Sequence, residues 1–139
     1  EGQAEIFGAE MVGLREYEWR GVKLAIFSWQ GARLAVKGQP EVEYVSGETA
    51  IPAHLNCHLA LETIRQTVSP RILLVGEGRR SVARTLLNYA VRQGRQPLWL
   101  NLDPKSLEYP LVPGSLAALP LDHPLGPCVE PGGPLGTLN

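Results

Sequence analysis

The sequence predicts an α/β protein, in which a small N-terminal antiparallel β-sandwich is followed by a first βαβ unit. Two observations predict this class. Up to about residue 50, short apolar or alternating runs are interrupted by glycine-containing turns, which is typical of short antiparallel strands. Over residues 70–103, an apolar run, a glycine-rich turn, a helical pattern and a second apolar run follow one another, which is the order of a βαβ unit.

Composition and charge exclude several classes of protein. The chain of 139 residues is 44% hydrophobic and 19% charged, so it can bury a core and is not disordered throughout. Its net charge of −1 argues against binding nucleic acid by bulk positive charge. No apolar run approaches the roughly 20 residues that span a bilayer, so we expect no membrane partner. Two cysteines give neither a disulfide framework nor a four-ligand zinc site, and we expect a reducing intracellular compartment.

Residues 1–50 are predicted to form the β-sandwich, incomplete at its start. The run at residues 24–27 is apolar on both faces, so it is predicted to be the central strand, with half-exposed neighbours. The three tryptophans, Trp19, Trp29 and Trp99, are expected in the core. A platform for stacking RNA bases would place them on one exposed face, which the alternation of the runs does not support.

Residues 51–69 are predicted to be a linker segment that contains one amphipathic helix over residues 52–66. Pro52 suits the first helical turn, and apolar side chains follow at helical spacing. His54, Cys57 and His58 are spaced so that they could face one metal ion. Three ligands from one helix with no fourth in view are more often a polar edge beside a buried cysteine, so we assign no metal site.

Residues 70–139 are predicted to form the partial second domain. The expected elements are a strand at 72–75, a helix at 81–93 and a strand at 97–102 that ends at Asp103. The two strands should be parallel, with a right-handed crossover. Residues 104–139 hold most of the 12 prolines, so we expect an ordered loop over the sheet edge at 111–121 and then a loose tail. Because two parallel strands are not stable alone, we expect the chain to be part of a longer one.

The glycine-rich turn is the strongest candidate for a functional site. Gly76 and Gly78 leave an apolar strand and enter a helix near Ser81, so backbone N–H groups and the positive end of the helix dipole point at one place. This arrangement is typical of a phosphate cradle, and the alternative is a tight turn without a ligand. The arginines around the turn either contact phosphate or RNA backbone, or are solvated charges: Arg71, Arg79, Arg80 and Arg84.

Two phosphate-binding patterns match this turn in part. In a Walker A loop, G-x-x-x-x-G-K-[ST], Gly78, Arg79 and Arg80 would stand at the final glycine, lysine and hydroxyl positions, but the loop is about three residues short. Arg80 also lacks the hydroxyl that ligates Mg²⁺. The dinucleotide fingerprint G-x-G-x-x-G matches the two glycines, with Ser81 at the third position and Asp103 placed to bind a ribose hydroxyl. A dinucleotide-binding oxidoreductase therefore stays open as a third class of function.

Several blocks of the sequence, in order, resemble one known family. They include EIFGAE at residues 5–10, KLAIFSW at 23–29, RILLVG at 71–76 and LLNYAVR at 86–92, with further blocks at 42–46, 55–62, 101–104 and 112–118. The likeness runs from about residue 2 to about residue 122. These blocks resemble the cleavage/polyadenylation factor subunit of the polynucleotide 5′-hydroxyl kinase family, over its N-terminal β domain and the start of its P-loop domain.

The resemblance implies a β-sandwich followed by a P-loop NTPase-like domain, with ATP between them; it leaves Mg²⁺ open. Lys23 falls where the family contacts adenine, although an edge lysine that discourages aggregation is equally consistent with the sequence. Asp103 falls at an acidic position beside Mg²⁺ and the γ-phosphate, although a role in the turn alone is also consistent. The expected nucleotide-binding residues are Lys23, Gly76, Gly78, Arg79, Arg80, Ser81 and Asp103.

The resemblance implies two functions. Some members phosphorylate RNA 5′-hydroxyl ends, and others bind ATP without turnover as scaffolds in nuclear pre-mRNA 3′-end cleavage, where they hold a partner subunit that reads the RNA polymerase II tail. The loop is short and both its Lys and its hydroxyl are replaced. We therefore expect a nuclear, ATP-binding, non-catalytic scaffold subunit that contacts other protein subunits, with pre-mRNA contacted only indirectly. An active RNA 5′-hydroxyl kinase is the alternative.

Overall fold

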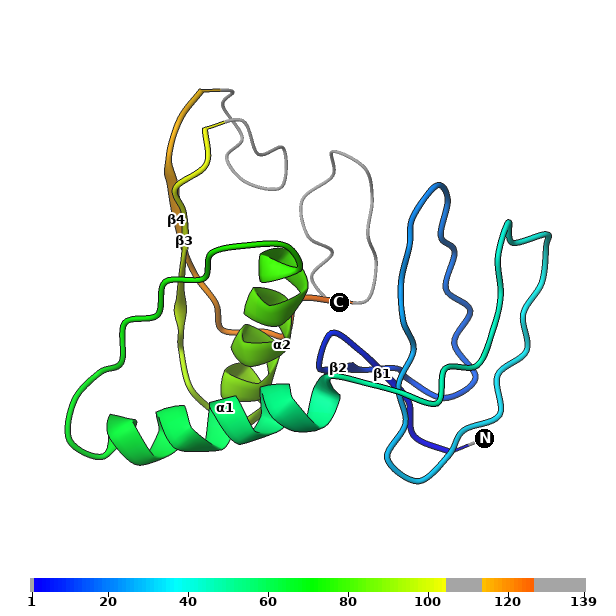
Figure 1. Cartoon of the computed structure of the whole chain (residues 1–139), viewed down its shortest axis with the longest axis horizontal. Helices are drawn as coiled ribbons and strands as arrows, with labels where there is room; N and C mark the ends of the chain where they lie inside the picture. Colours follow the sequence, from blue (N-terminus) through cyan, green and yellow to red (C-terminus); the bar gives the residue numbers. More distant parts are fainter. Residues whose placement is uncertain (1, 105–113, 127–139) are drawn as a thin grey trace.

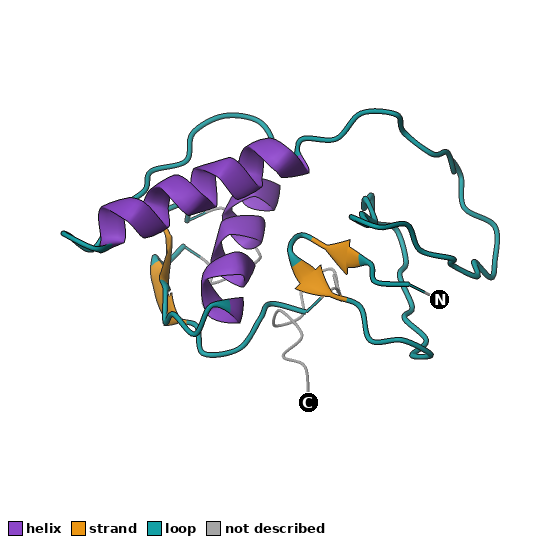
Figure 2. Ribbon diagram, turned by 90° about the horizontal axis from the view of Figure 1, so that it is seen from below, coloured by secondary structure: helices purple, strands orange, loops and turns teal. Residues whose placement is uncertain are grey.

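The computed structural model describes residues 2–104 and 114–126, and these contain two helices and four short strands. In order they are β1 (Glu5–Ile6), β2 (Ala9–Glu10), α1 (Ile51–Arg65), α2 (Arg79–Arg92), β3 (Leu98–Asn101) and β4 (Ala117–Pro120). Figures 1 and 2 show α1 crossing α2, with β3 and β4 on one side of α2 and the β1–β2 hairpin on the other. The predicted fold class is confirmed, because N-terminal antiparallel strands are followed by helices and strands.

β1 and β2 form a tight antiparallel hairpin. Ile6 pairs with Ala9, and both side chains are buried. Phe7 and Gly8 form the two-residue turn, with φ of 50° and 77°. Left-handed backbone at both positions is what a type I′ turn requires. A bulky residue such as Phe7 is rarely found there, so contacts around the turn have to stabilise it.

Most of the predicted sandwich is irregular in the described residues. Residues 24–27 do not form the predicted central strand. Their one ladder contact joins Phe27 to Glu5, whose backbone groups exchange hydrogen bonds of 2.8 and 2.9 Å. A strand needs a hydrogen-bonded neighbour along its length, and Ala25 is exposed instead of enclosed between two sheets. The expectation that all three tryptophans are core residues is also wrong, since Trp29 is 54% exposed.

The helix predicted at residues 52–66 is confirmed as α1. Pro52 lies in its first turn, where the missing N–H removes no helical hydrogen bond. α1 packs across α2 and buries His58, whose ring centroid lies 5.7 Å from that of Tyr89. Cys57 is exposed, contrary to expectation. In the described part of the chain, neither helix is long and apolar enough to cross a membrane.

The helix predicted at residues 81–93 is confirmed as α2, and β3 confirms the strand predicted at 97–102. The core lies between α2 and the β3–β4 pair. Its buried members are Val91, Leu121 and Leu125, with Leu87, Trp99 and Leu119 packed against them. Leu125 therefore does not belong to the loose tail predicted after residue 121; residues 127–139 lie outside the described residues.

The parallel pairing predicted for the βαβ unit is wrong. β3 pairs with β4 in antiparallel register, with Leu98 opposite Pro120 and Asn101 opposite Ala117. The segment predicted as a loop at 111–121 therefore contributes β4. β4 is stabilised because its alternate side chains, such as Leu119, reach the core beside α2.

The strand predicted at residues 72–75 is also not formed. Leu73 and Val75 are 77% and 84% exposed, and no described strand pairs with this segment. An apolar run becomes a strand where a neighbour supplies hydrogen bonds and a surface to bury, and here neither is supplied. The glycine-rich turn therefore follows an extended segment, not a buried strand.

Candidate functional site

The candidate site is the turn that precedes α2. Gly76 and Gly78 have φ of 113° and 74°, values that side chains other than hydrogen rarely permit. Gly78 is the N-cap of α2, and its carbonyl accepts the first helical hydrogen bond from the Val82 N–H, at 3.1 Å. The N–H groups of residues 79–81 therefore open the helix at the positive end of its dipole.

The space over this turn is open. A Cβ added at Gly76 or Gly78 would meet no atom within 4 Å. A phosphate group could therefore approach the backbone closely, as a glycine-rich cradle requires. The backbone of the turn and the first amides of α2 fit an anion.

Arg79 connects the turn to the end of β3. Its Nη1 donates to the Gly76 carbonyl at 3.3 Å, and its Nη2 lies 3.7 Å from Asp103 Oδ2. The side chains of Arg79 and Asp103 are 47% and 43% exposed, so their ion pair is hydrated and weak. A phosphate would be a stronger partner for this guanidinium than the distant carboxylate is.

The structure brings together some of the predicted site residues and not others. Gly76, Arg79 and Asp103 are joined by the contacts above. Ser81 is half-buried, and its carbonyl accepts a hydrogen bond of 2.9 Å from the Thr85 hydroxyl, which fixes the first turns of α2. Arg80 is exposed at the start of the helix. Lys23 is exposed in the β region, and within residues 2–104 and 114–126 no hydrogen bond or ion pair links it to the turn.

The site fits phosphate better than it fits a magnesium ion. Mg²⁺ prefers octahedral oxygen ligands, whereas the hydroxyl position holds Arg80 and the Asp103 carboxylate faces a guanidinium. The described residues also contain no group of three His, Cys, Asp or Glu side chains that could hold a metal. The chemistry available at the turn is therefore anion binding by amides and guanidinium groups.

The sequence pattern did not predict that polar side chains on one face of α2 are buried. Arg84, Thr85 and Asn88 are almost fully buried, although such side chains usually indicate an exposed helix face. With Tyr89 and Arg92, they contact the β1–β2 hairpin or the segment after β4. The only signal in the sequence is their spacing of three or four residues, which places them on one side of the helix.

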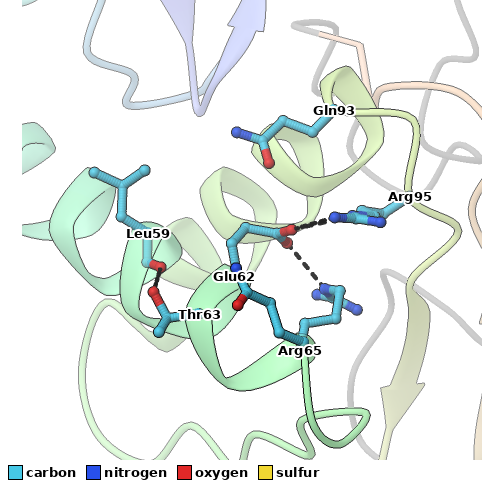
Figure 3. A pocket seen from close by; sticks show the side chains of 7 residues that line it. Leu59, Glu62, Thr63, Arg65, Gln93 and Arg95 are labelled. Carbon is cyan, nitrogen blue, oxygen red and sulfur yellow. Dashed lines mark hydrogen bonds and ion pairs between the residues drawn. The ribbon is translucent and has the colours of Figure 1, made fainter.

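A groove of about 540 Å³ lies near the C-terminal ends of the two helices (Figure 3). Glu62 of α1 accepts hydrogen bonds from Arg65 Nε at 2.9 Å and Arg95 Nε at 3.0 Å. Burial of Glu62 acts to raise its pKa, but the hydrogen bonds and charges of the two arginines outweigh this and hold the pKa below its usual value. Because both arginines already neutralise Glu62, we interpret the cluster as a structural tie between α1 and the segment after α2.

Two family models match the chain. The one described as "N-terminal beta-sandwich domain of polyadenylation factor" matches residues 1–68. The one described as "mRNA cleavage and polyadenylation factor CLP1 P-loop" matches residues 75–132. The first match ends just after α1, and the second begins immediately before Gly76. The candidate turn therefore stands at the start of the region that matches the P-loop model.

Curated relatives are similar over most of the chain. "Protein CLP1 homolog" of Nematostella vectensis is 42% identical over 135 residues, which covers 88% of this chain and 31% of the relative. "Polyribonucleotide 5'-hydroxyl-kinase Clp1" is 41% identical over 133 residues in Danio rerio and 38% identical over 133 residues in Homo sapiens. These matches cover 88% of this chain and 30% and 31% of those relatives. The chain thus spans about a third of the length of the relatives it matches.

Proposed function

Because this chain belongs to the CLP1 family of mRNA cleavage and polyadenylation factors, we propose that it is an ATP-binding, non-catalytic scaffold subunit of the pre-mRNA 3′-end cleavage and polyadenylation machinery. The observation that carries the proposal is the open glycine turn at the N-terminus of α2, with Arg79 beside it. ATP then serves as a structural ligand, and its binding to the folded state alone stabilises that state.

In this proposal, the phosphates of ATP bind the amides of residues 79–81 and the Arg79 guanidinium. Gly76 and Gly78 let the phosphates approach the backbone, while Arg80 and Ser81 flank them. Asp103 pairs weakly with Arg79 when no nucleotide is bound. Lys23 contacts the adenine from the β region.

The non-catalytic half of the proposal follows from the replaced side chains. A P-loop kinase uses a lysine against the β- and γ-phosphates and a hydroxyl on Mg²⁺. Here Arg79 and Arg80 occupy those two positions. A guanidinium can bind phosphate oxygens in a fork geometry, but Arg80 supplies no oxygen ligand for Mg²⁺. Phosphate binding is therefore retained, while positioning of the metal for phosphoryl transfer is lost.

We propose the following organisation for the chain. Residues 1–50 form the N-terminal β domain, incomplete at its start, residues 51–69 form the linker with its helix, and residues 70–139 form a partial P-loop ATPase-like domain. The partners are protein subunits of the 3′-end cleavage complex, including one that binds the RNA polymerase II tail. The location is the nucleus, where this processing takes place, and contact with pre-mRNA is indirect.

A second candidate is an active polyribonucleotide 5′-hydroxyl kinase. The observation that favours it is the name carried by several relatives, such as those of Danio rerio and Homo sapiens. The two candidates differ in one measurable reaction. The kinase transfers the γ-phosphate of ATP to an RNA 5′-hydroxyl in the presence of Mg²⁺, and the scaffold does not.

Two assays test the proposal. Calorimetric titration with ATP should show binding, and Arg79→Ala should raise the Kd about tenfold or more, because charge-assisted hydrogen bonds are lost. Arg20→Ala is the matched control, since Arg20 is also an exposed arginine paired with one carboxylate. Absence of ATP binding by the parent protein would refute the proposed function. Incubation with labelled ATP, Mg²⁺ and 5′-hydroxyl RNA should leave the RNA unlabelled, and labelling would establish the kinase instead.

A further inference from the structure

The tip of the β1–β2 hairpin is inserted against the side of α2. A Cβ added to Gly8 would lie 3.0 Å from the Thr85 carbonyl and 3.1 Å from the Tyr89 ring, so no larger residue fits without displacement. The Arg84 guanidinium carbon lies 4.9 Å from the centroid of the Phe7 ring. Phe7 and Gly8, the two residues of the hairpin turn, therefore both contact α2 directly.

Asn88 fixes the hairpin tip with its side-chain amide. It is fully buried, and its Nδ2 donates to the Phe7 carbonyl at 2.8 Å and to the Leu125 carbonyl at 3.1 Å. Its Oδ1 accepts the Leu125 N–H at 2.7 Å. One side chain thus joins the hairpin, α2 and the segment after β4.

The base of the hairpin is held by a partly buried ion pair between Glu5 and Arg92. Glu5 accepts hydrogen bonds from the Tyr89 hydroxyl at 2.7 Å and from Arg92 Nη1 at 3.0 Å. Arg92 Nη1 also donates to the Gly8 carbonyl at 3.1 Å, and Nη2 pairs with Glu10. Since the Glu5 side chain is only 6% exposed, the pair depends on this one docked arrangement.

We propose that the hairpin tip, Phe7–Gly8, is a positioning element for the nucleotide turn, and this inference rests on the proposed ATP-binding function. The turn and the docked hairpin share one continuous helix. Arg79 opens α2 at the turn, and Arg84, which contacts Phe7, lies five residues further along, about 7.5 Å on the helix axis. Docking fixes α2 against the β region and thereby fixes the direction of the amides that face the phosphates.

The coupling acts in both directions. If the docked hairpin raises the affinity of the turn for ATP, bound ATP must stabilise docking of the hairpin by the same factor. The hairpin also belongs to the β region that carries Lys23, the proposed adenine contact. Docking therefore determines how both regions of the nucleotide site are placed relative to each other.

Gly8→Ala tests the inference without altering any residue of the nucleotide turn before α2. The added methyl group collides with Thr85 and Tyr89 and should raise the Kd for ATP about tenfold, within the usual range for coupled sites. Gly21→Ala is the matched control, because Gly21 also has a positive φ, of 61°, but an added Cβ would meet no atom within 4 Å. The control should bind ATP as the parent does. Binding is measured by titration at a temperature where circular dichroism shows each variant folded.

Phe7→Asn provides a second test that does not weaken the hairpin itself. Asn-Gly is a preferred type I′ turn, so this variant stabilises the hairpin while removing the ring beside Arg84. We expect this variant to be folded without ATP. It should nevertheless bind ATP more weakly than the parent and show a smaller ATP-induced rise in Tm. A purely structural role would leave the Kd unchanged. Equal Kd values for the parent, Gly8→Ala and Phe7→Asn would overturn the inference, whereas no ATP binding by the parent would overturn the proposed function as well.

Discussion

Replacing Asn88 by alanine tests a buried contact that joins α2 to the hairpin and to the segment after β4. The side chain makes three hydrogen bonds, to the Phe7 carbonyl, the Leu125 carbonyl and the Leu125 N–H, at 2.8, 3.1 and 2.7 Å. All three partners belong to backbone outside α2. Because alanine is the better helix former, any loss of stability must come from these lost contacts and not from the helix itself.

The expected loss follows from the count of hydrogen bonds. Each contributes about 1 kcal/mol net, and a buried partner left without a hydrogen bond costs about 1–3 kcal/mol. Leu125 is 3% exposed, so the variant leaves its buried N–H without the Asn88 acceptor. We therefore expect Asn88→Ala to lower the free energy of unfolding by about 3–4 kcal/mol, a large part of the stability of an ordinary domain.

Urea unfolding followed by circular dichroism measures this loss. The matched control is Asn56→Ala, because Asn56 is an exposed asparagine in the middle of α1. It should not lower the free energy of unfolding, because alanine is the better helix former and the exposed side chain makes no buried contact. If Asn88→Ala and Asn56→Ala unfold at the same urea concentration, the three hydrogen bonds do not hold the hairpin and the argument from buried polar contacts fails.

Three further variants and one control test the site and its surroundings. Asp103→Asn should strengthen ATP binding up to about fivefold, because it releases Arg79 from an exposed ion pair. If the variant instead binds ATP more weakly in titrations with Mg²⁺, Asp103 is a metal ligand. The folded-state pKa of Glu62 lies below its ordinary value of 4.5, so its contribution to stability is present above that pH and is lost as the pH falls through the folded-state pKa. Glu62→Gln should reduce the fall in melting temperature that occurs as the pH is lowered. The control, Glu43→Gln, should leave this fall unchanged. Burial and the hydrogen bond to β1 raise the pKa of Tyr89 well above its ordinary 10.0, so stability is full below about pH 10 and falls above it. Tyr89→Phe should lose about 1 kcal/mol at neutral pH and show a weaker alkaline decline in thermal melts.

Local signals predicted the helices and one strand correctly. Pro52 and the helical spacing after it were sufficient for α1, and Gly78 and Gly94 bracket α2 closely enough to place it. These features depend on nearby residues alone. The same holds for the glycine turn, whose positive φ angles follow from the identity of its glycines.

Strand pairing could not be predicted in the same way. Residues 72–75 and β3 have similar apolar patterns, but only β3 has a partner, and that partner lies in a segment whose prolines suggested a loop. The choice depends on contacts between distant segments. The burial and hydrogen bonds of Asn88 could not be predicted for the same reason, since its partners lie 37 and 81 residues away in the chain.

The candidate site was predicted in part. The sequence suggested that Arg79 and Asp103 serve the same turn, and the structure places them 3.7 Å apart. Lys23 had no local signal beyond the apolar run that follows it, and its predicted adenine contact rests on the family likeness alone. Its position relative to the turn depends on how the β region docks, which no short-range pattern encodes.

The distance in sequence between Glu5 and its partners has a consequence for synthesis of the protein. Tyr89 and Arg92 follow Glu5 by 84 and 87 residues. At a translation speed of about 5–20 residues per second, the ribosome makes the hairpin roughly 4–17 s before it completes the helix that neutralises Glu5. The nascent hairpin therefore carries the Glu5 carboxylate without its two partners until residues 89 and 92 have been made, and it can dock only after almost the whole of α2 has emerged.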